Sequence, residues 1–398
     1  MNRSDFLMFN EDIIYFDNGA TTFKPITVIE GMNKYYNSYS ANAHRGDYDI
    51  SLKVDIAYEG VRDKLKDFIN AKYREEIIFT SGSTDGLNMI ANGFFKNILE
   101  AGDEILLTES EHASNVMPWI NLVEEIGCNI RYIPLDGDYH VTVDNFKKMI
   151  NSNTKVVSIA EITNVIGDIR PIDEITKIAH ENNIFVVVDA AQSMPHKKID
   201  VTRSDVDFLV ASAHKMCGPT GVGILYGKVN LLEELYPTRL GGGMNESFNI
   251  YNQMEFKDLP HRLEAGTQNI AGVIGYGYAI DYLSNIGMDK IYSHELTLRK
   301  YLIDRLITIP HIDIINIEGD SGIVAFNVIG LYAEEVAYYL NKYNICVRAG
   351  SHCAKNLSNV TNVDETVRIS LYLYNTESEI DELIELLSDY NKINRELL

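Results

Sequence analysis

The sequence predicts an α/β protein with a large domain built on a mostly parallel, doubly wound sheet and a smaller α+β C-terminal domain. Between residues 75 and 226, short runs rich in Val, Ile and Leu alternate with helical stretches. Strands that are apolar along their whole length are typical of parallel sheets covered by helices on both faces. After residue 283, short strands and long helices replace that alternation. The 398 residues also exceed what one hydrophobic core usually spans.

The large domain is expected to start its sheet with EEIIFT, followed by the turn SGSTDGLN and a helix. Later strands are recognised by β-branched and aliphatic runs, and helices by longer stretches between them. The expected strands span 75–80, 103–108, 129–135, 155–162, 184–190, 206–214 and 221–227. The expected helices span 81–95, 113–126 and 171–182.

The C-terminal part predicts a mixture of helices and short strands. Helices are expected at 288–307, 332–343 and 376–395, and strands near 312–317, 322–328, 345–348 and 366–370. We divide the chain into an N-terminal segment (1–25) that packs with the small domain, a large domain (26–282) and a small domain (283–398). No repeat or linker-like tract separates these parts, so we expect them to be closely joined.

Composition excludes several classes of protein. A formal charge of −22 argues against a non-specific nucleic-acid binder and against binding to anionic lipid. No run approaches the roughly 18 apolar residues of a membrane helix, and the N-terminus does not read as a signal peptide. The four cysteines contain no CxxC pair, so neither a disulfide framework nor a metal site is predicted. A reducing, cytoplasmic location fits this pattern.

Polar residues follow the ends of five predicted strands. Ligands of open parallel sheets bind beyond the carboxyl ends of the strands, so these residues are expected at one rim. They are Ser83, Thr84 and Asp85; Glu111 and His112; Asn164; Asp189; and Ser212, His214 and Lys215.

The turn SGSTDGLN after the first strand suits an anion such as a phosphate. Glycine lets the backbone approach a ligand, and a helix N-terminus presents free N–H groups. The alternative is an ordinary helix cap, because Ser, Thr and Asp are preferred capping residues. The later GPTGVG precedes a strand instead of opening a helix, so it is not a dinucleotide-binding motif.

Lys215 and Asp189 are the most informative pair. A lysine at the end of a buried strand tends to have a lowered pKa, and a neutral amine forms Schiff bases; the alternative is a side chain that reaches solvent. Asp189 could cap a helix, ligate a metal or keep a pyridine nitrogen protonated. One strand–helix–strand step separates the two residues, so their strands are plausible neighbours. This relation favours pyridoxal phosphate (PLP) as a cofactor.

Cys353 is the cysteine with a reactive setting. It lies beside His352 in a short loop downstream of Arg348, and such surroundings favour a thiolate. The alternative is a small apolar residue in a loop. Arg368 lies in a predicted strand and could bind a carboxylate in bidentate fashion, although a surface arginine is an equal alternative.

These residues lie within segments that resemble the class-V aminotransferases, a group of fold-type I PLP enzymes, and within them the group II cysteine desulfurases. The matching segments are YFDNGATTFKP (15–25), NAHRGDYDIS (42–51), SGSTDGLN (81–88), SEHASNVMPW (110–119), TNVIGDIRPI (163–172), VVVDAAQSMPH (186–196), SAHKMCGPTGVGILYG (212–227), HRLEAGTQN (261–269), RAGSHCA (348–354) and VRISLYLYNT (367–376). Their order and spacing extend over nearly the whole chain.

The resemblance implies a role for each matching residue. Lys215 would carry the aldimine of PLP, Asp189 would pair with the pyridine nitrogen, Gln192 would contact the ring hydroxyl, and His112 would stack on the ring and move protons. Ser83, Thr84, Ser212 and His214 would hold the phosphate, with Thr267 from the other subunit of a homodimer. Asn164 would contact the cofactor and, with His44, Arg348 and Arg368, the substrate L-cysteine. Cys353 would take the sulfur as a persulfide, leaving L-alanine, and pass it to an acceptor protein for iron–sulfur cluster or thio-cofactor assembly.

Four positions depart from the family pattern. Ser351, Ala113, Glu161 and Gln268 replace residues that are commonly bulkier, histidine or proline. Glu161, if near the site, would disfavour a thiolate. The alternatives to a desulfurase are a selenocysteine lyase, another class-V aminotransferase or PLP lyase in which Cys353 is incidental, and a degenerate member that only binds sulfur-transfer proteins.

Overall fold

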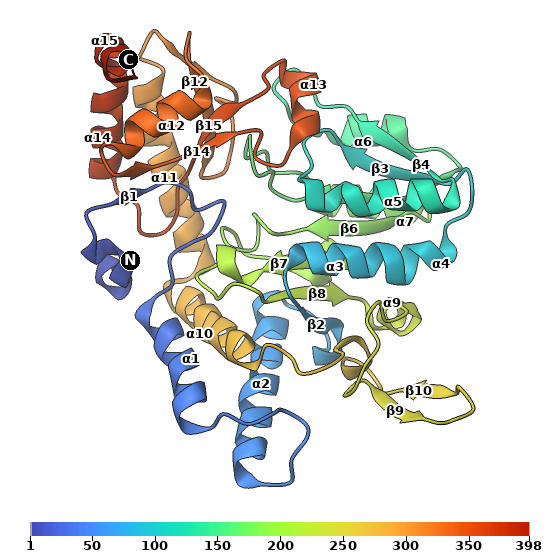
Figure 1. Cartoon of the computed structure of the whole chain (residues 1–398). Coiled ribbons are helices and arrows are strands. Elements are labelled where there is room, and N and C mark those ends of the chain that lie inside the picture. The colour runs from blue at the N-terminus through green and yellow to red at the C-terminus, as the bar shows by residue number, and fades with distance from the viewer. Residues whose placement is uncertain (1, 398) are drawn as a thin grey trace.

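The computed structural model describes residues 2–397 and contains two main sheets, each with its own hydrophobic core (Figure 1). The larger sheet has the order β2-β8-β7-β6-β5-β3-β4. Its strands are β2 (Ile77–Thr80), β3 (Glu104–Thr108), β4 (Asn129–Ile133), β5 (Thr154–Ala160), β6 (Phe185–Asp189), β7 (Phe208–Ser212) and β8 (Gly223–Gly227). The predicted α/β class with a mostly parallel sheet is confirmed.

One strand of the sheet, β8, runs against its neighbours. It pairs antiparallel with both β2 and β7, while the pairs from β7 to β4 are parallel. A parallel connection needs a crossover of a dozen or more residues, and the link 213–222 between β7 and β8 is shorter than that. The chain therefore turns back directly, and this turn contains Lys215.

Alternating strand residues fill the two faces of the large sheet. In β6, Val186 and Val188 belong to the core on one face, while Val187 points into the core on the other. The first face is covered by α1 (Ile26–Ser38), α2 (Asp49–Phe68), α6 (Val143–Met149), α7 (Ile172–Glu181) and α10 (Ile270–Ile286). The second is covered by α3 (Ser83–Met89), the π-helical segment Ile90–Phe95, α5 (Met117–Ile126) and α9 (Val229–Glu234). The short helices α4 (Lys96–Ile98) and α8 (Val201–Ser204) complete this part.

The smaller sheet is antiparallel and has the order β11-β12-β15-β14. Its strands are β11 (Ile312–Ile314), β12 (Ile323–Val328), β14 (Arg348–Gly350) and β15 (Thr366–Ser370). Its helices are α11 (Met288–Leu306), α12 (Ala333–Asn341), α13 (Ser358–Thr361), α14 (Glu377–Ser388) and α15 (Tyr390–Leu397). The helix expected over 376–395 thus breaks into α14 and α15.

The N-terminal segment joins the small sheet's side of the molecule, where both termini lie in Figure 1. Its strand β1 (Ile14–Tyr15) pairs with β13 (Ile345–Cys346), and Asp17 bridges to Ser370 at the end of β15. These pairings hold Asp17, Asn18 and Gly19 against the end of β15, where they contact Arg368 and Ser370.

A hairpin of β9 (Asn245–Phe248) and β10 (Met254–Phe256) projects from the large domain (Figure 1). Its tip exposes large apolar side chains, including Phe248, Ile250 and Tyr251. Among residues 2–397, no helix has both the length and the apolar character needed to cross a membrane.

Candidate active site

A cavity of about 230 Å³ lies at the carboxyl ends of the parallel strands, beneath β14 and β15 of the small sheet. It brings together twelve of the residues singled out from the sequence. They are Ser83, Thr84, His112, Asn164, Asp189, Gln192, Ser212, His214, Lys215, Arg348, Cys353 and Arg368. The strand ends β2, β3, β5, β6 and β7 therefore meet at one rim, as expected for an open parallel sheet.

Lys215 and Asp189 both line this cavity, Asp189 as the last residue of β6 and Lys215 in the turn directly after β7. β6 and β7 pair in parallel, with Asp189 opposite Val210. Burial lowers the pKa of Lys215 from 10.5 to about 8, although the Asp189 carboxylate partly opposes this shift. Burial also raises the pKa of Asp189 to about 6, while the N–H of Ala191 stabilises its charged form at 2.9 Å. The site thus holds an amine that is easily neutralised beside a buried carboxylate.

His112 faces the same cavity as a neutral imidazole. Its Nδ1 accepts a hydrogen bond from the Ser114 N–H at 3.1 Å, which leaves Nε2 as the protonated nitrogen. Burial, followed by the charge of Lys215, lowers its pKa to about 4. At neutral pH His112 is therefore uncharged and can present an N–H donor.

Hydroxyl groups gather at the end of the cavity next to β2. The Ser212 hydroxyl lies 2.9 Å from that of Ser83 and accepts the Ser83 N–H at 2.8 Å. The Thr84 hydroxyl lies 2.7 Å from that of Ser114. Gly82 has φ 147°, a conformation that residues with a side chain rarely adopt, and a Cβ there would lie 3.2 Å from the Ser212 oxygen. The turn after β2 therefore meets the end of β7, and four hydroxyls surround one small space.

His214 completes this group of polar side chains. Its backbone oxygen accepts the Thr22 N–H at 3.0 Å, so the N-terminal segment fixes the turn after β7. Burial lowers the pKa of the His214 ring to about 4. The ring is therefore neutral at pH 7.

Arg368 enters the cavity from the middle of β15 and is 2% exposed. Its Nη2 donates to Asp17 Oδ1 at 2.8 Å, and its Nη1 donates to the Asn164 backbone oxygen at 2.9 Å. Arg348, on β14, lies 4.0 Å from the other Asp17 oxygen. The register of β14 and β15 brings the two arginines together, because Arg348 and Arg368 are direct cross-strand partners. Two guanidinium groups therefore share one carboxylate at the cavity wall.

Cys353 stands in a tight turn directly after β14. Both His352 (φ 51°) and Cys353 (φ 59°) adopt left-handed backbone conformations, which cost energy in residues other than glycine. The turn is held by the Ala113 N–H, which donates to the Cys353 oxygen at 2.8 Å, and by His352 Nε2, which lies 2.9 Å from the Thr366 hydroxyl. The thiol side of Cys353 is exposed and borders the cavity.

His44 and Thr267 lie outside this cavity within the single chain. Thr267 lines a separate pocket beside β2, and His44 lines another next to His261. Asn42 Nδ2 donates to the Thr267 hydroxyl at 3.4 Å, so the two segments are neighbours. The roles expected of His44 and Thr267 stay predictions.

The four residues that depart from the family pattern make local contacts in the structure. The Glu161 carboxylate forms an ion pair with Lys197 at 2.7 Å, and the cavity is lined by its neighbours Ala160 and Ile162 instead. Gln268 donates to the Ala265 backbone oxygen at 3.0 Å. Ala113 and Ser351 flank the Cys353 turn through backbone bonds. Glu161 therefore adds a charge that is already paired.

Sequence reasoning from strand ends missed residues that non-local contacts bring to the site. Gly19 accepts a hydrogen bond from Gln192 Nε2 at 2.9 Å, and a Cβ on Gly19 would lie 3.1 Å from the Arg368 guanidinium carbon. Asp17 and Ser114 also contact site residues. The segment YFDNGATT contains Asp17 and Gly19, but nothing local in it marks them as site residues.

The residues of the cavity fit PLP. Four buried polar atoms on its lining residues, Gln192 Oε1, Asn164 Oδ1, Arg368 Nε and His352 Nδ1, have no hydrogen-bond partner within residues 2–397. Buried polar atoms nearly always have partners, so a polar ligand is the natural complement. Hydroxyls and a neutral imidazole suit a phosphate, Asp189 suits a pyridine nitrogen, and Lys215 suits an aldehyde.

The profile of the class-V aminotransferases matches residues 14–383. The chain belongs to this family. Class-V aminotransferases and cysteine desulfurases are PLP enzymes. A probable cysteine desulfurase of Halalkalibacterium halodurans is 42% identical over 371 residues, covering 93% of this chain and 91% of the relative. A cysteine desulfurase of Haloferax volcanii is 37% identical over 378 residues, covering 94% and 88%.

Solved cysteine desulfurases share the whole fold of this class-V aminotransferase. The enzyme from Escherichia coli superposes with a TM-score of 0.93 at 31% identity, covering 100% of this chain and 98% of that one. The apo enzyme from Thermococcus onnurineus superposes with a TM-score of 0.94 at 34% identity, covering 99% and 97%. The predicted resemblance to cysteine desulfurases is confirmed.

Proposed function

We propose that this class-V aminotransferase is a PLP-dependent cysteine desulfurase, which converts L-cysteine to L-alanine and retains the sulfur as a persulfide on Cys353. One observation carries the proposal. A single cavity joins a buried lysine of lowered pKa, a buried carboxylate, two arginines and an accessible thiol. A transaminase would need the first four groups, but it would have no use for a thiol facing the reacting atoms.

PLP, when bound, supplies an electron sink that stabilises negative charge at the substrate Cα. Asp189 would pair with the ring nitrogen, Gln192 with the ring hydroxyl, and Ser83, Thr84, Ser212 and His214 with the phosphate. Since the pKa of Lys215 is about 8, part of its population is a neutral amine at pH 7. Such an amine can bind a carbonyl carbon or take a proton from Cα. The uncharged His112 ring beside it can move a proton.

The substrate carboxylate is assigned to Arg368 and Asn164, with Arg348 at the entrance. Arg368 is already oriented by Asp17 and by the Asn164 backbone, so little side-chain entropy is lost when a carboxylate binds. Its unpartnered Nε and the Asn164 amide oxygen lie at the same wall. The carboxylate would accept from the guanidinium, while Asn164 would bind a donor of the cofactor or substrate.

Cys353 is the sulfur acceptor of the reaction. Its sulfur forms an S–S bond to the substrate sulfur while the substrate Cβ–S bond breaks. The electron pair of that bond stays on carbon, which takes up a proton and becomes the methyl group of alanine. Cysteine and a thiol thus give alanine and a persulfide, with no outside oxidant or reductant.

The persulfide requires a protein acceptor because the Cys353 turn is short. The turn is tied to Ala113 and Thr366 on either side, which limits its reach. We assign the acceptor to iron–sulfur cluster or thio-cofactor assembly. We also propose a homodimer in which Thr267 of one subunit completes the phosphate site of the other.

Two variants test this proposal. Lys215→Ala should lose the visible absorption of bound PLP, whereas Cys353→Ala should keep that absorption and lose sulfide release from cysteine. Retention of sulfide release by Cys353→Ala would reassign the chain to another PLP lyase. A parent protein that stays colourless after incubation with PLP would instead favour the degenerate, binding-only alternative.

A further inference from the structure

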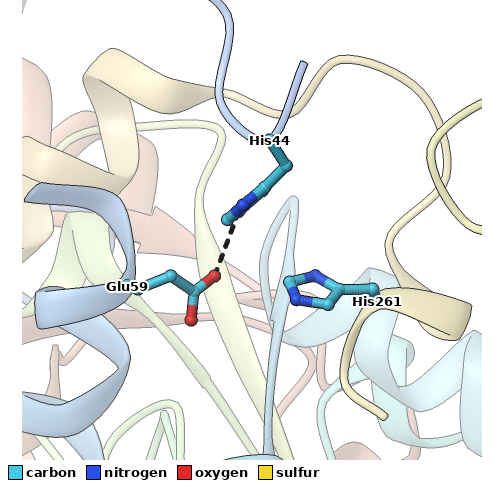
Figure 2. Close-up of side chains that lie close together, drawn as sticks. All are labelled: His44, Glu59 and His261. Carbon is cyan, nitrogen blue, oxygen red and sulfur yellow. Dashed lines mark ion pairs between the residues drawn. The ribbon is translucent and has the colours of Figure 1, made fainter. Parts of the chain in front are cut away.

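A second cluster of ligating side chains lies outside the active-site cavity. His44 of the loop after α1, Glu59 of α2 and His261 of the segment before α10 point toward one another in Figure 2. Each offers one ligand atom, and these atoms all lie within 4.8 Å of one another. His44 Nε2 is 3.2 Å from Glu59 Oε1. Tetrahedral zinc, with bonds of about 2.0–2.1 Å, places its ligand atoms about 3.4 Å apart, so this pair already has the required spacing.

The surroundings orient His44 as a metal ligand. Its backbone N–H donates to Asp55 Oδ1 at 2.6 Å, and its Nδ1 faces the same oxygen at 3.7 Å. Metal-binding histidines commonly present their other ring nitrogen to a carboxylate, which fixes the ring and its tautomer. This arrangement leaves Nε2 directed at Glu59 and His261.

His261 lies opposite with its ring free. Its ring centroid is 4.8 Å from that of His44, and within residues 2–397 no hydrogen bond engages its nitrogens. An imidazole without a partner beside a carboxylate and a second imidazole is available as a third ligand.

Glu59 also contacts arginines, but these arginines have carboxylates of their own. Arg62 binds Glu264 at 2.7 Å, and Arg74 binds Asp63 at 3.2 Å, in addition to their bonds with Glu59. The Glu59 oxygen that faces His44, Oε1, also accepts a hydrogen bond from Arg62 Nη2 at 3.1 Å. The arginines therefore fix the orientation of the Glu59 carboxylate toward His44.

A cavity of about 190 Å³ adjoins the cluster and leaves room for a fourth ligand. Arg45 and Lys257 also line it, so that position suits water or an anion. Two histidines, one glutamate and an open position are a ligand set that zinc adopts in proteins.

We propose that His44, Glu59 and His261 form a binding site for a divalent transition metal of the zinc class. The site would tie the loop around His44, helix α2 and the segment that leads to Thr267 into one unit. The sequence contains no sign of it, because the three ligands come from distant parts of the chain.

The test is metal stoichiometry in the PLP-loaded, untagged protein carrying Cys353→Ser, which removes the thiol as a competing ligand. After dialysis against Zn²⁺ or Co²⁺, we expect one more bound ion per chain in this protein than in its His44→Gln and His261→Gln derivatives. Bound Co²⁺ should give the intense visible bands of a four-coordinate site, and Zn²⁺ should raise the melting temperature only where both histidines are present.

His180→Gln is the matched control. His180 pairs with Asp205 and Asp207 at 3.2 and 3.0 Å but belongs to no three-ligand cluster in the described part of the chain, so this variant should bind metal like its parent. The proposal is overturned if the parent retains no ion after dialysis, or if both histidine variants retain as much as the parent. Since His44 is on an exposed loop, His44→Gln remains informative even if His261→Gln folds poorly.

Discussion

Replacing Arg368 by lysine tests the assignment of the substrate carboxylate most sharply. Arg368 is 2% exposed, and two of its nitrogens are already held at 2.8 and 2.9 Å, so the guanidinium has one orientation. A lysine keeps the charge but offers only one point of attachment. The substrate would lose one charge-assisted hydrogen bond, worth about 1.5–3 kcal/mol. This energy corresponds to a kcat/KM about 10- to 150-fold lower.

The loss should fall mainly on KM, because the carboxylate is bound equally in the ground state and the transition state. The assay is alanine formation over a range of cysteine concentrations, after visible absorption and the melting temperature have shown that the variant is folded and loaded. Arg348→Lys is the control, because Arg348 is 42% exposed and should change kcat/KM by about fivefold or less. A folded Arg368→Lys variant whose kcat/KM also changes by about fivefold or less would refute the assignment.

Two further predictions concern the lysine and the network beneath it. The pKa of Lys215 lies below its ordinary value, so the neutral amine should form as the pH rises toward about 8. The rate at which the apoprotein regains visible absorption with PLP should therefore rise about tenfold per pH unit below pH 8 and then level off. Because the Asp189 carboxylate raises that pKa, Asp189→Asn should shift the midpoint to lower pH, and a rate independent of pH would contradict this account. Arg170→Met should lower the free energy of unfolding by about 3–5 kcal/mol in urea titrations, because it strands the fully buried Glu111 carboxylate. Adding Glu111→Gln should recover part of the loss, and Lys300→Met, which breaks an exposed pair with Asp304, should cost less than about 1 kcal/mol.

The sequence predicted the part of the site that depends on local order along the chain. Asp189 and Lys215 each follow an apolar run, and the carboxyl ends of parallel strands must share one edge, so their meeting could be foreseen. The reversal of β8 could also have been predicted, because the link 213–222 is too short for a parallel crossover.

The cavity wall that the small sheet contributes depends on how its strands pair, which no local sequence pattern reveals. Arg368 reaches the cavity only because β15 lies between β12 and β14, and Cys353 because its turn binds Ala113. The local sequence suggested what these residues could do, and the family resemblance alone placed them in one site. Asp17 was missed because its place depends on non-local contacts, namely the β1–β13 pairing, the bridge to Ser370 and the ion pair with Arg368. The His44–Glu59–His261 cluster was missed because its members are far apart in the chain.

The central claim is that sulfur leaves cysteine and arrives on Cys353. The direct measurement is mass spectrometry of the PLP-loaded protein after one turnover with cysteine and no acceptor, with alanine quantified in the same sample. We expect one alanine per loaded site and one added sulfur atom on the peptide that contains Cys353. Alanine without added sulfur on that peptide, or equal alanine from Cys353→Ser, would contradict the account.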